Sequence, residues 1–285
     1  MISQLTTLPV RHATGLSEMQ RSTTADLREN FLVQSLFEPD QICATYTHYD
    51  RVVVGGVMPC TESVALPPFK NLKATYFLER RELGIINVGG PGSVTADGVR
   101  YDLTKLDGLY ISRGSQQVIF DSYDEAEPAR FFLMSAPAHA AYPTAKLAKE
   151  AANPTRLGSR QTANERTIYK YIHAGNGGLA SCQLVMGLTV LEPGSVWNTM
   201  PAHVHDRRME AYCYFDLPAD HRVFHLMGPP DQTRHIVVAN HQAVISPPWS
   251  IHSGCGTASY SFIWGMAGEN MDFADMDFAP ISDLL

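Results

Sequence analysis

The stretch AHVHDRRMEAY, residues Ala202–Tyr212, carries two histidines one residue apart and a glutamate five residues after the second histidine. Residues i and i+2 of a β-strand point to the same face, so His203 and His205 would present their imidazole rings side by side. Glu210 has the opposite parity, and a single straight strand could not bring it to that face. The intervening DRRM segment must therefore turn or bulge and place Glu210 on the next strand, beside the two histidines.

A third histidine follows in the stretch ISPPWSIHSG, some forty residues downstream. Two prolines end one strand there, and His252 begins the next. An HxH pair alone is common on strand surfaces, so the prediction depends on all four residues. The pattern HxHxxxxE followed by PPWSIH resembles the metal site of cupins, whose ligands project into the mouth of a small barrel. In this chain the corresponding residues would be His203, His205, Glu210 and His252. Three nitrogen donors and one carboxylate suit Zn, Fe, Mn, Ni or Cu and leave positions for water or substrate.

Short runs of β-branched, aromatic and aliphatic residues recur along the chain, each bounded by Gly, Pro, Asn or Asp. Examples are RVVVGGVMP from Arg51 and CQLVMGLTVLEPG from Cys182. Such runs are typical of antiparallel strands in a sandwich or barrel. Only Met19–Phe31 and Thr144–Ala152 are helix candidates. We therefore predict an all-β fold with few short helices.

The two halves of the chain resemble each other. YFLERRELGIINVGG (Tyr76–Gly90) aligns with HVHDRRMEAYCYFDL (His203–Leu217), and both contain an acidic residue followed by two arginines. We predict two β domains, residues 1–150 and 172–285, joined by a polar linker over residues 151–171. The alternative is one continuous β sandwich, because all-β domains can reach this size.

The first half lacks the residues that would make a second metal site. Glu79, Arg80 and Arg81 stand where ligands would be, and the later ISRGSQQ segment lacks the downstream histidine. The resemblance to cupins implies a bicupin of two double-stranded β-helix (jelly-roll) barrels. We expect the N-terminal barrel to be metal-free and the C-terminal barrel to bind the metal.

Composition excludes several classes of partner. The chain has 285 residues, a net charge of -7 and no Lys or Arg run, which argues against nucleic acid. No apolar run approaches the roughly 20 residues needed to span a bilayer, and the N-terminus does not read as a secretion signal. The five cysteines are widely spaced without a CxxC pair, so no disulfide framework is expected. We expect a cytoplasmic protein.

Four blocks closely resemble one family: YFLERRELGIINVGG, WNTMPAHVHDRRMEAYCYF, GPPDQTRHIVVANHQAVISPPWSIHSG and FIWGMAGEN. They are similar to the 5-keto-4-deoxyuronate isomerases (4-deoxy-L-threo-5-hexosulose-uronate ketol-isomerases) of bacterial pectin breakdown, from about Leu27 to the C-terminal residues. The resemblance implies a bicupin, a homo-hexamer and one zinc ion per subunit, held by His203, His205, Glu210 and His252. It implies conversion of 5-dehydro-4-deoxy-D-glucuronate, a small anionic uronate, to 3-deoxy-D-glycero-2,5-hexodiulosonate.

The implied reaction moves a carbonyl from C1 to C2 of an open-chain sugar acid. Either a base removes the C2 proton to give an enediolate, or hydride shifts directly, and the metal acts as a Lewis acid in both routes. A tyrosine, a histidine or a metal-bound hydroxide is a candidate base, and the sequence assigns none. Arg160, Arg166 and Lys170 of the predicted linker are candidates for binding the substrate carboxylate; the alternative is that they are solvated surface charges.

Two other functions share the same four ligands. Three histidines and a glutamate also hold Fe(II) in cupin dioxygenases, and other divalent ions fit the same donor set. A non-enzymatic, pirin-like regulatory or sugar-binding cupin would use the metal for structure only. The resemblance to the isomerases favours the isomerase over both.

Overall fold

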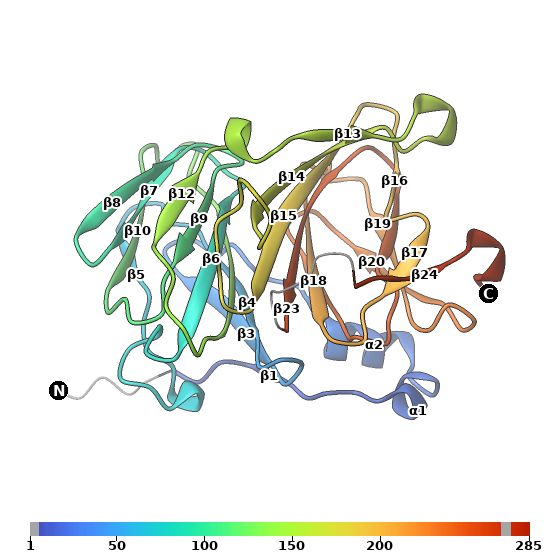
Figure 1. The fold of residues 1–285 in the computed structure, drawn as a ribbon, viewed down its shortest axis with the longest axis horizontal. Helices are drawn as coiled ribbons and strands as arrows, with labels where there is room; N and C mark the ends of the chain where they lie inside the picture. Colours follow the sequence, from blue (N-terminus) through green and yellow to red (C-terminus); the bar gives the residue numbers. More distant parts are fainter. Residues whose placement is uncertain (1–5, 269–274) are drawn as a thin grey trace.

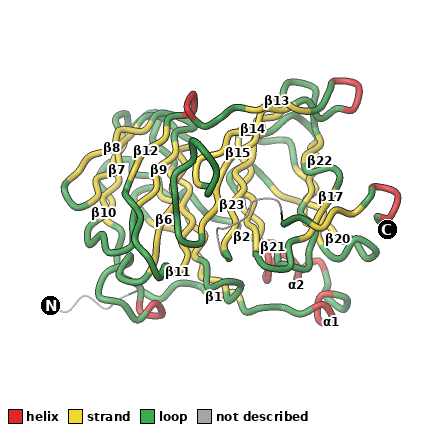
Figure 2. Tube along the Cα trace, in the orientation of Figure 1, coloured by secondary structure: helices red, strands yellow, loops and turns green. Residues whose placement is uncertain are grey.

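Strands make up most of the regular structure, as the alternating apolar runs predict (Figure 2). The computed structural model describes residues 6–268 and 275–285; the last two residues of the FIWGMAGEN block, 269–270, lie outside them. Two helices lie at the periphery, α1 (Leu16–Met19) and α2 (Thr24–Phe31). The all-β prediction with few short helices is confirmed for the described residues.

The first half contains a seven-stranded sheet and a four-stranded sheet. The larger sheet has the order β1-β3-β4-β11-β6-β9-β12, which is Val10–Arg11, Ile42–Thr47, Val53–Val57, Phe131–Pro137, Arg81–Asn87, Gly108–Ile111 and Ala145–Leu147. The smaller has the order β5-β10-β7-β8, which is Val64–Ala65, Val118–Ser122, Gly92–Ala96 and Val99–Leu103. Apolar side chains of both sheets form one buried cluster, so the two sheets pack face to face.

The second half repeats this arrangement (Figure 1). Its larger sheet has the order β13-β14-β15-β23-β18-β21-β2, which is Thr155–Leu157, Arg166–Ile172, Leu184–Leu191, Ser261–Ala267, Met209–Phe215, Ala243–Ser246 and Leu32–Val33. Its smaller sheet has the order β16-β22-β19-β20, which is Trp197–Asn198, Ser253–Gly256, Val223–Met227 and Arg234–Val238. A separate two-stranded sheet joins β17 (Ala202–Val204) to β24 (Asp277–Ala279).

Strands β6 and β18 occupy the same place in the two larger sheets. Leu83 of β6 pairs with Ser135 of β11 and with the last residue of β9. Glu210 of β18 pairs with Met266 of β23 and with the last residue of β21. The sequence alignment of the two halves also places Leu83 opposite Glu210. These two residues therefore stand at equivalent positions.

The N-terminal segment crosses to the second half. Thr23 caps the N-terminus of α2. Its hydroxyl oxygen accepts a hydrogen bond from the backbone N–H of Asp26, and the Asp26 carboxylate accepts one from the backbone N–H of Thr23. Strand β2 then pairs with β21, and in Figure 1 both helices lie below the second half. Residues 16–33, which the predicted boundaries assign to the first domain, thus complete the second half, because β2 covers the otherwise open edge of β21.

Two local predictions differ from the structure. The helix predicted over Thr144–Ala152 is wrong: Ala145–Leu147 pairs with the edge of β9 as β12, and Lys149–Ala151 is a single 3-10 turn. The pairing with an open sheet edge overrides helix propensity. The segment predicted as a linker, residues 151–171, contains β13 and most of β14, both in the second half's larger sheet.

The two larger sheets pack against each other through an apolar core that both halves supply. Glycines allow the close approach: a Cβ at Gly84 would meet Met186 Sδ at 2.2 Å, and one at Gly265 would meet Met134 Sδ at 2.3 Å. Glu82, fully buried here, accepts the backbone N–H groups of residues 182–184 at 2.6–2.8 Å. The core and this carboxylate join the halves.

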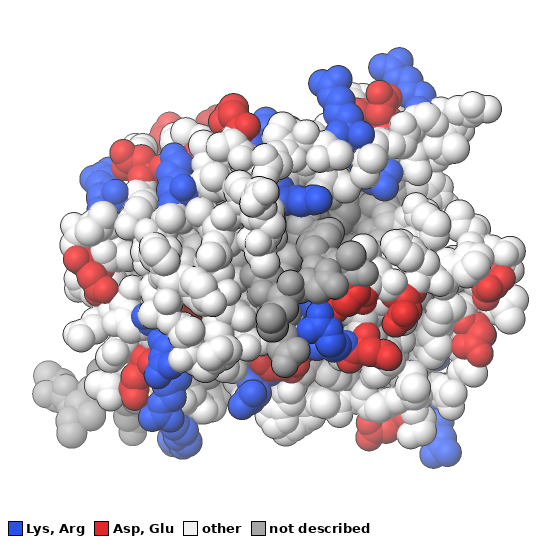
Figure 3. Space-filling view, in the orientation of Figure 1, with Lys and Arg blue, Asp and Glu red and all other residues white. Residues whose placement is uncertain are grey.

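Acidic and basic side chains alternate over the face shown in Figure 3, without a broad basic patch. This distribution accords with the net charge of -7. None of the described helices is long and apolar enough to cross a membrane.

Candidate metal centre

The second half brings the four predicted ligands together. His203 lies on β17, His205 follows it in the turn, Glu210 lies on β18 and His252 immediately precedes β22. The chain reverses between β17 and β18, where the N–H of Arg208 donates to the carbonyl of His205. This is the turn that the strand parity of the two histidines and the glutamate requires.

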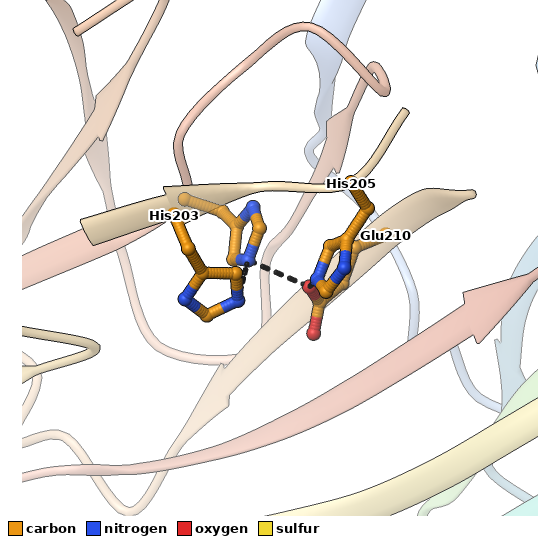
Figure 4. A group of neighbouring side chains, drawn as sticks. His203, His205 and Glu210 are labelled. Atoms are coloured by element: carbon orange, nitrogen blue, oxygen red, sulfur yellow. Dashed lines mark hydrogen bonds and ion pairs between the residues drawn. The ribbon is translucent and has the colours of Figure 1, made fainter. Parts of the chain in front are cut away.

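One ligand atom from each of the four residues lies within 4.8 Å of the others. Nε2 of His252 is 2.8 Å from Oε2 of Glu210 and 2.9 Å from Nε2 of His203, and Nε2 of His205 is 3.3 Å from the same carboxylate oxygen. Figure 4 shows the side chains of His203, His205 and Glu210 pointing toward one another. Within the described residues this is the one such group of His, Cys, Asp or Glu side chains.

The protonation states of the site suit a cation. Burial, reinforced by the neighbouring His252, lowers the pKa of His203 to about 3, so its imidazole is neutral at physiological pH. Burial raises the pKa of Glu210, but the attraction of His252 and His205 outweighs it and holds that pKa below its usual value. Neutral imidazole and ionised carboxylate are the forms that coordinate metals.

Buried polar atoms give an independent test of fit. Nε2 of His205 and Oε2 of Glu210 are shielded from solvent and lie 3.3 Å apart, and that oxygen is 2.8 Å from Nε2 of His252. Neither atom makes a hydrogen bond of good geometry among the described residues, and burying such an atom without one is costly. A divalent cation bound by the four ligands would satisfy both, so the residues fit a metal of the type that imidazole and carboxylate bind.

A cavity of about 370 Å³ opens beside the ligands. Its walls come from β14, β15, β18 and β23 and are largely apolar, with Phe262, Trp264 and Met266 on β23. The segment Thr199–Pro201 and two residues of the C-terminal segment, Met276 and Phe278, complete the lining. A small polar molecule could therefore reach the ligands in largely apolar surroundings.

Two of the three predicted carboxylate-binding residues lie at this cavity. Arg166 and Lys170 line it from β14, together with Ile168, because alternate residues of a strand share one face. Arg160 lies elsewhere: its exposed side chain is 3.3 Å from the carboxylate of Glu165. The structure thus brings Arg166 and Lys170 to the predicted metal ligands and leaves Arg160 on the surface.

Several residues of the site were not identified from the sequence. Tyr212 lines the cavity, and its hydroxyl is 2.8 Å from Oγ1 of Thr199. Burial, with the charge of Glu210, raises the pKa of Tyr212 well above its usual value, so the phenol keeps its proton. Beneath it, Tyr214 hydrogen-bonds Nδ1 of the fully buried His225 at 2.7 Å. The alternation Glu210, Tyr212, Tyr214 on one face of β18 could have indicated the first of these.

The sequence was compared with known families and proteins. Residues 31–281 match the model of the KduI/IolB family. The chain belongs to this family. The match covers most of the chain. It explains why the four sequence blocks resemble the uronate isomerases, because all four lie within residues 31–281.

Curated relatives share one name. A protein of Halalkalibacterium halodurans is 58% identical over 274 residues, which is 96% of this chain and 99% of that one; a protein of Shouchella clausii is 54% identical over 277 residues, 97% of this chain and 100% of that one. Both are named 4-deoxy-L-threo-5-hexosulose-uronate ketol-isomerase. This member of the KduI/IolB family is accordingly an enzyme of the ketol-isomerase class, an intramolecular oxidoreductase.

Solved structures agree on the fold at low sequence identity. An IolB-like protein from Salmonella typhimurium LT2 superposes with a TM-score of 0.70 at 17% identity, over 88% of this chain and 97% of that one. A Bacillus subtilis oxalate decarboxylase studied for its Mn(II) centres gives a TM-score of 0.54 at 10% identity, over 78% of this chain and 70% of that one. At such identities the likeness concerns the fold alone.

Proposed function

We propose that the chain is a zinc-dependent aldose–ketose isomerase that converts 5-dehydro-4-deoxy-D-glucuronate to 3-deoxy-D-glycero-2,5-hexodiulosonate in uronate breakdown. The observation that carries the proposal is the group of three histidines and one glutamate beside a cavity that two basic residues also line. The names of the relatives in the KduI/IolB family supply the substrate.

The cavity's cations would bind the substrate carboxylate. Arg166 is partly buried on β14, and burial lowers its pKa, which marks a guanidinium held in surroundings poor in water. A guanidinium offers two parallel N–H donors to a carboxylate. Lys170, two residues beyond Ile168 on the same face, adds a second positive charge. Binding at this end would direct C1 and C2 of the open chain toward the histidines.

At the reacting end, Tyr212 holds a proton beside Glu210. Its raised pKa makes the phenol a hydrogen-bond donor, and Thr199 Oγ1 at 2.8 Å orients the hydroxyl. A donor placed where negative charge develops on a substrate oxygen lowers the barrier. Phe262, Trp264 and Met266 make the neighbouring wall of the cavity apolar. A zinc ion, when bound by the four ligands, supplies a Lewis acid for the same carbonyl group.

An isomerase assay in D2O tests the proposal. The purified protein is incubated with 5-dehydro-4-deoxy-D-glucuronate, and loss of the C1 aldehyde is followed by NMR. We expect turnover that stops with a chelator and returns with Zn²⁺. Deuterium on the product's terminal CH2OH carbon, which was the aldehyde C1 of the substrate, would identify proton transfer through solvent; protium retained there would identify a hydride shift or proton transfer without solvent exchange. No loss of aldehyde by the zinc-loaded protein would contradict the proposal.

The dioxygenase and the regulatory alternatives use the same four ligands, so metal binding alone does not separate them from the isomerase. Family membership and the relatives' names favour the isomerase. Oxygen uptake during the same assay separates the dioxygenase, because an isomerase consumes none. Binding of the uronate without loss of its aldehyde would identify the non-enzymatic cupin.

The assembly and location are part of the proposal and rest on the sequence resemblance. We propose a cytoplasmic homo-hexamer of bicupin subunits, with a metal-free N-terminal barrel and one zinc ion per subunit in the C-terminal barrel. Light scattering coupled to size-exclusion chromatography gives the subunit number. Elemental analysis of the same fractions gives the zinc stoichiometry.

A further inference from the structure

The two deeply buried histidine ligands differ in what their second ring nitrogen meets. Nδ1 of His252 donates to the carbonyl of Ser250 at 3.3 Å, which leaves Nε2 to face Glu210. Nδ1 of His205 is buried and makes no hydrogen bond among the described residues, but Oδ1 of Asp275 lies only 3.6 Å away. Metal-binding histidines normally donate this N–H to a carboxylate, a carbonyl or water, which fixes the ring and its tautomer.

Asp275 is itself held by two arginines of the turn between the ligands. Oδ2 accepts from Nη2 of Arg207 at 2.8 Å, and Oδ1 accepts from Nη2 of Arg208. The Arg208 side chain is fully buried and that of Asp275 is 15% exposed. A buried guanidinium requires a nearby negative charge. Arg207 and Arg208 belong to the turn that also carries His205, so their positive charges hold the Asp275 carboxylate beside this histidine.

Backbone pairing on the C-terminal side of Asp275 fixes the segment 275–285. β24 pairs with β17, and Phe278 stands opposite His203. Among the described residues, β24 is the only sheet neighbour of β17. At the chain end, Leu285 accepts from the N–H of Thr233 at 2.8 Å. In Figure 1, β17 and β24 run side by side on the second half.

We infer that Asp275 is a positioning residue of the metal centre, supplied by the C-terminal segment 275–285. Its carboxylate accepts the Nδ1–H of His205 when the metal is bound, so that Nε2 presents its lone pair to the ion. The arginine pair Arg207 and Arg208 holds the carboxylate 3.6 Å from Nδ1 of His205, so that a shift of less than about 1 Å closes the hydrogen bond. The inference rests on the metal centre of the proposed function but concerns metal affinity, which can be measured without substrate.

The test compares two carboxylates of the same segment. Asp275→Asn removes the charge beside His205, whereas Asp277→Asn removes an exposed charge on β24. Chelator-treated wild type and variants are titrated with Zn²⁺ against a chromogenic chelator, and Co²⁺-loaded samples are compared by visible absorption. We expect Asp275→Asn to weaken zinc binding about 10- to 100-fold and to shift the Co²⁺ bands. Asp277→Asn should stay within about twofold of wild type, since an exposed charge contributes little.

Loss of a buried ion pair could by itself weaken the fold, and a second variant separates this effect. Asp275→Asn combined with Arg208→Met removes both charges, and thermal unfolding in chelator reports whether the metal-free fold has recovered. Zinc affinity that stays low in a recovered fold supports the inference. Wild-type affinity in Asp275→Asn, or in the recovered double variant, overturns it and leaves the metal centre standing. Absence of zinc binding by the wild type overturns the inference and the metal centre together.

Discussion

The two halves of the molecule share one arrangement of strands but hold different side chains at equivalent positions. In the second half, His205 and Glu210 are 3.3 Å apart beside a cavity. The residues aligned with them in the first half, Leu78 and Leu83, are buried in an apolar core. Strand order therefore determines which positions meet, while the side chains at those positions decide between a closed core and a polar site.

The largest expected effect comes from removing one ligand. His203→Ala should abolish zinc retention and lower isomerase activity by at least about 10³-fold, because the Lewis acid is worth several kcal/mol. The matched control is Tyr76→Ala, at the aligned position of the first half, which should keep the zinc. Elemental analysis and the aldehyde assay measure both variants, and circular dichroism should show an unchanged β fold. Full activity in a metal-free His203→Ala protein would remove the metal from the mechanism.

The second prediction introduces the carboxylate of Glu210 at the equivalent position of the first half, Leu83. Leu83→Glu would bury a carboxylate among apolar neighbours, with Leu78 where a histidine would be needed. We expect a loss of about 3–5 kcal/mol in the free energy of unfolding, as for an uncompensated buried charge, and no additional zinc. Leu83→Met, which preserves volume, should cost less than about 1.5 kcal/mol. Denaturant titration measures both; a second equivalent of zinc in Leu83→Glu would show that the strand frame suffices to make a site.

Some of the difference between the halves could be predicted from sequence. The parity of His203, His205 and Glu210 required a turn after the histidines, and the structure has it between β17 and β18. That inference succeeded because it depends on local periodicity, which a sequence displays directly. The first half differs: the sequence predicts Glu79, Arg80 and Arg81 where ligands would be, whereas the strand pairing puts Leu83 at the position equivalent to Glu210.

Long-range pairings could not be predicted in the same way. β2 joins β21 across some 210 residues, and Asp275 reaches His205 from a segment 70 residues downstream. Periodicity shows which face of a strand is apolar but not which distant edge it meets. The predicted Thr144–Ala152 helix failed for the same reason, because the edge of β9 recruits Ala145–Leu147 as a strand.

The third prediction concerns the pH dependence of stability. Among the described residues, every buried histidine lies after residue 150, so this dependence should arise in the second half. Burial lowers the pKa of His225 to about 3, whereas an unfolded histidine titrates near 6.5. As pH falls from about 6.5 toward 3, the unfolded state gains a proton that the folded state does not, so stability falls. Between pH 7 and pH 5, His225 should account for about 2 kcal/mol of this loss.

Denaturant titration of chelator-treated protein at the two pH values measures the effect. His225→Gln, which keeps a hydrogen-bonding group near Tyr214, should lose less stability on acidification than wild type by that amount. Equal losses in the two proteins would mean that the pH dependence arises from other groups, such as the ligands themselves.

The smallest expected effect tests what β14 adds to the second half. Its counterpart in the first half, β3, carries no basic residue, whereas β14 presents Arg166 and Lys170 to the cavity. Arg166→Gln should raise KM about tenfold with little change in kcat, because a partly buried ion pair with the substrate carboxylate would be lost while the ligands stay in place. Arg160→Gln is the control, since Arg160 pairs with Glu165 on the surface, and its KM should equal that of wild type. An unchanged KM in Arg166→Gln would assign carboxylate binding to Lys170 alone or to another part of the cavity, whereas a fall in kcat would place Arg166 at the reacting carbons.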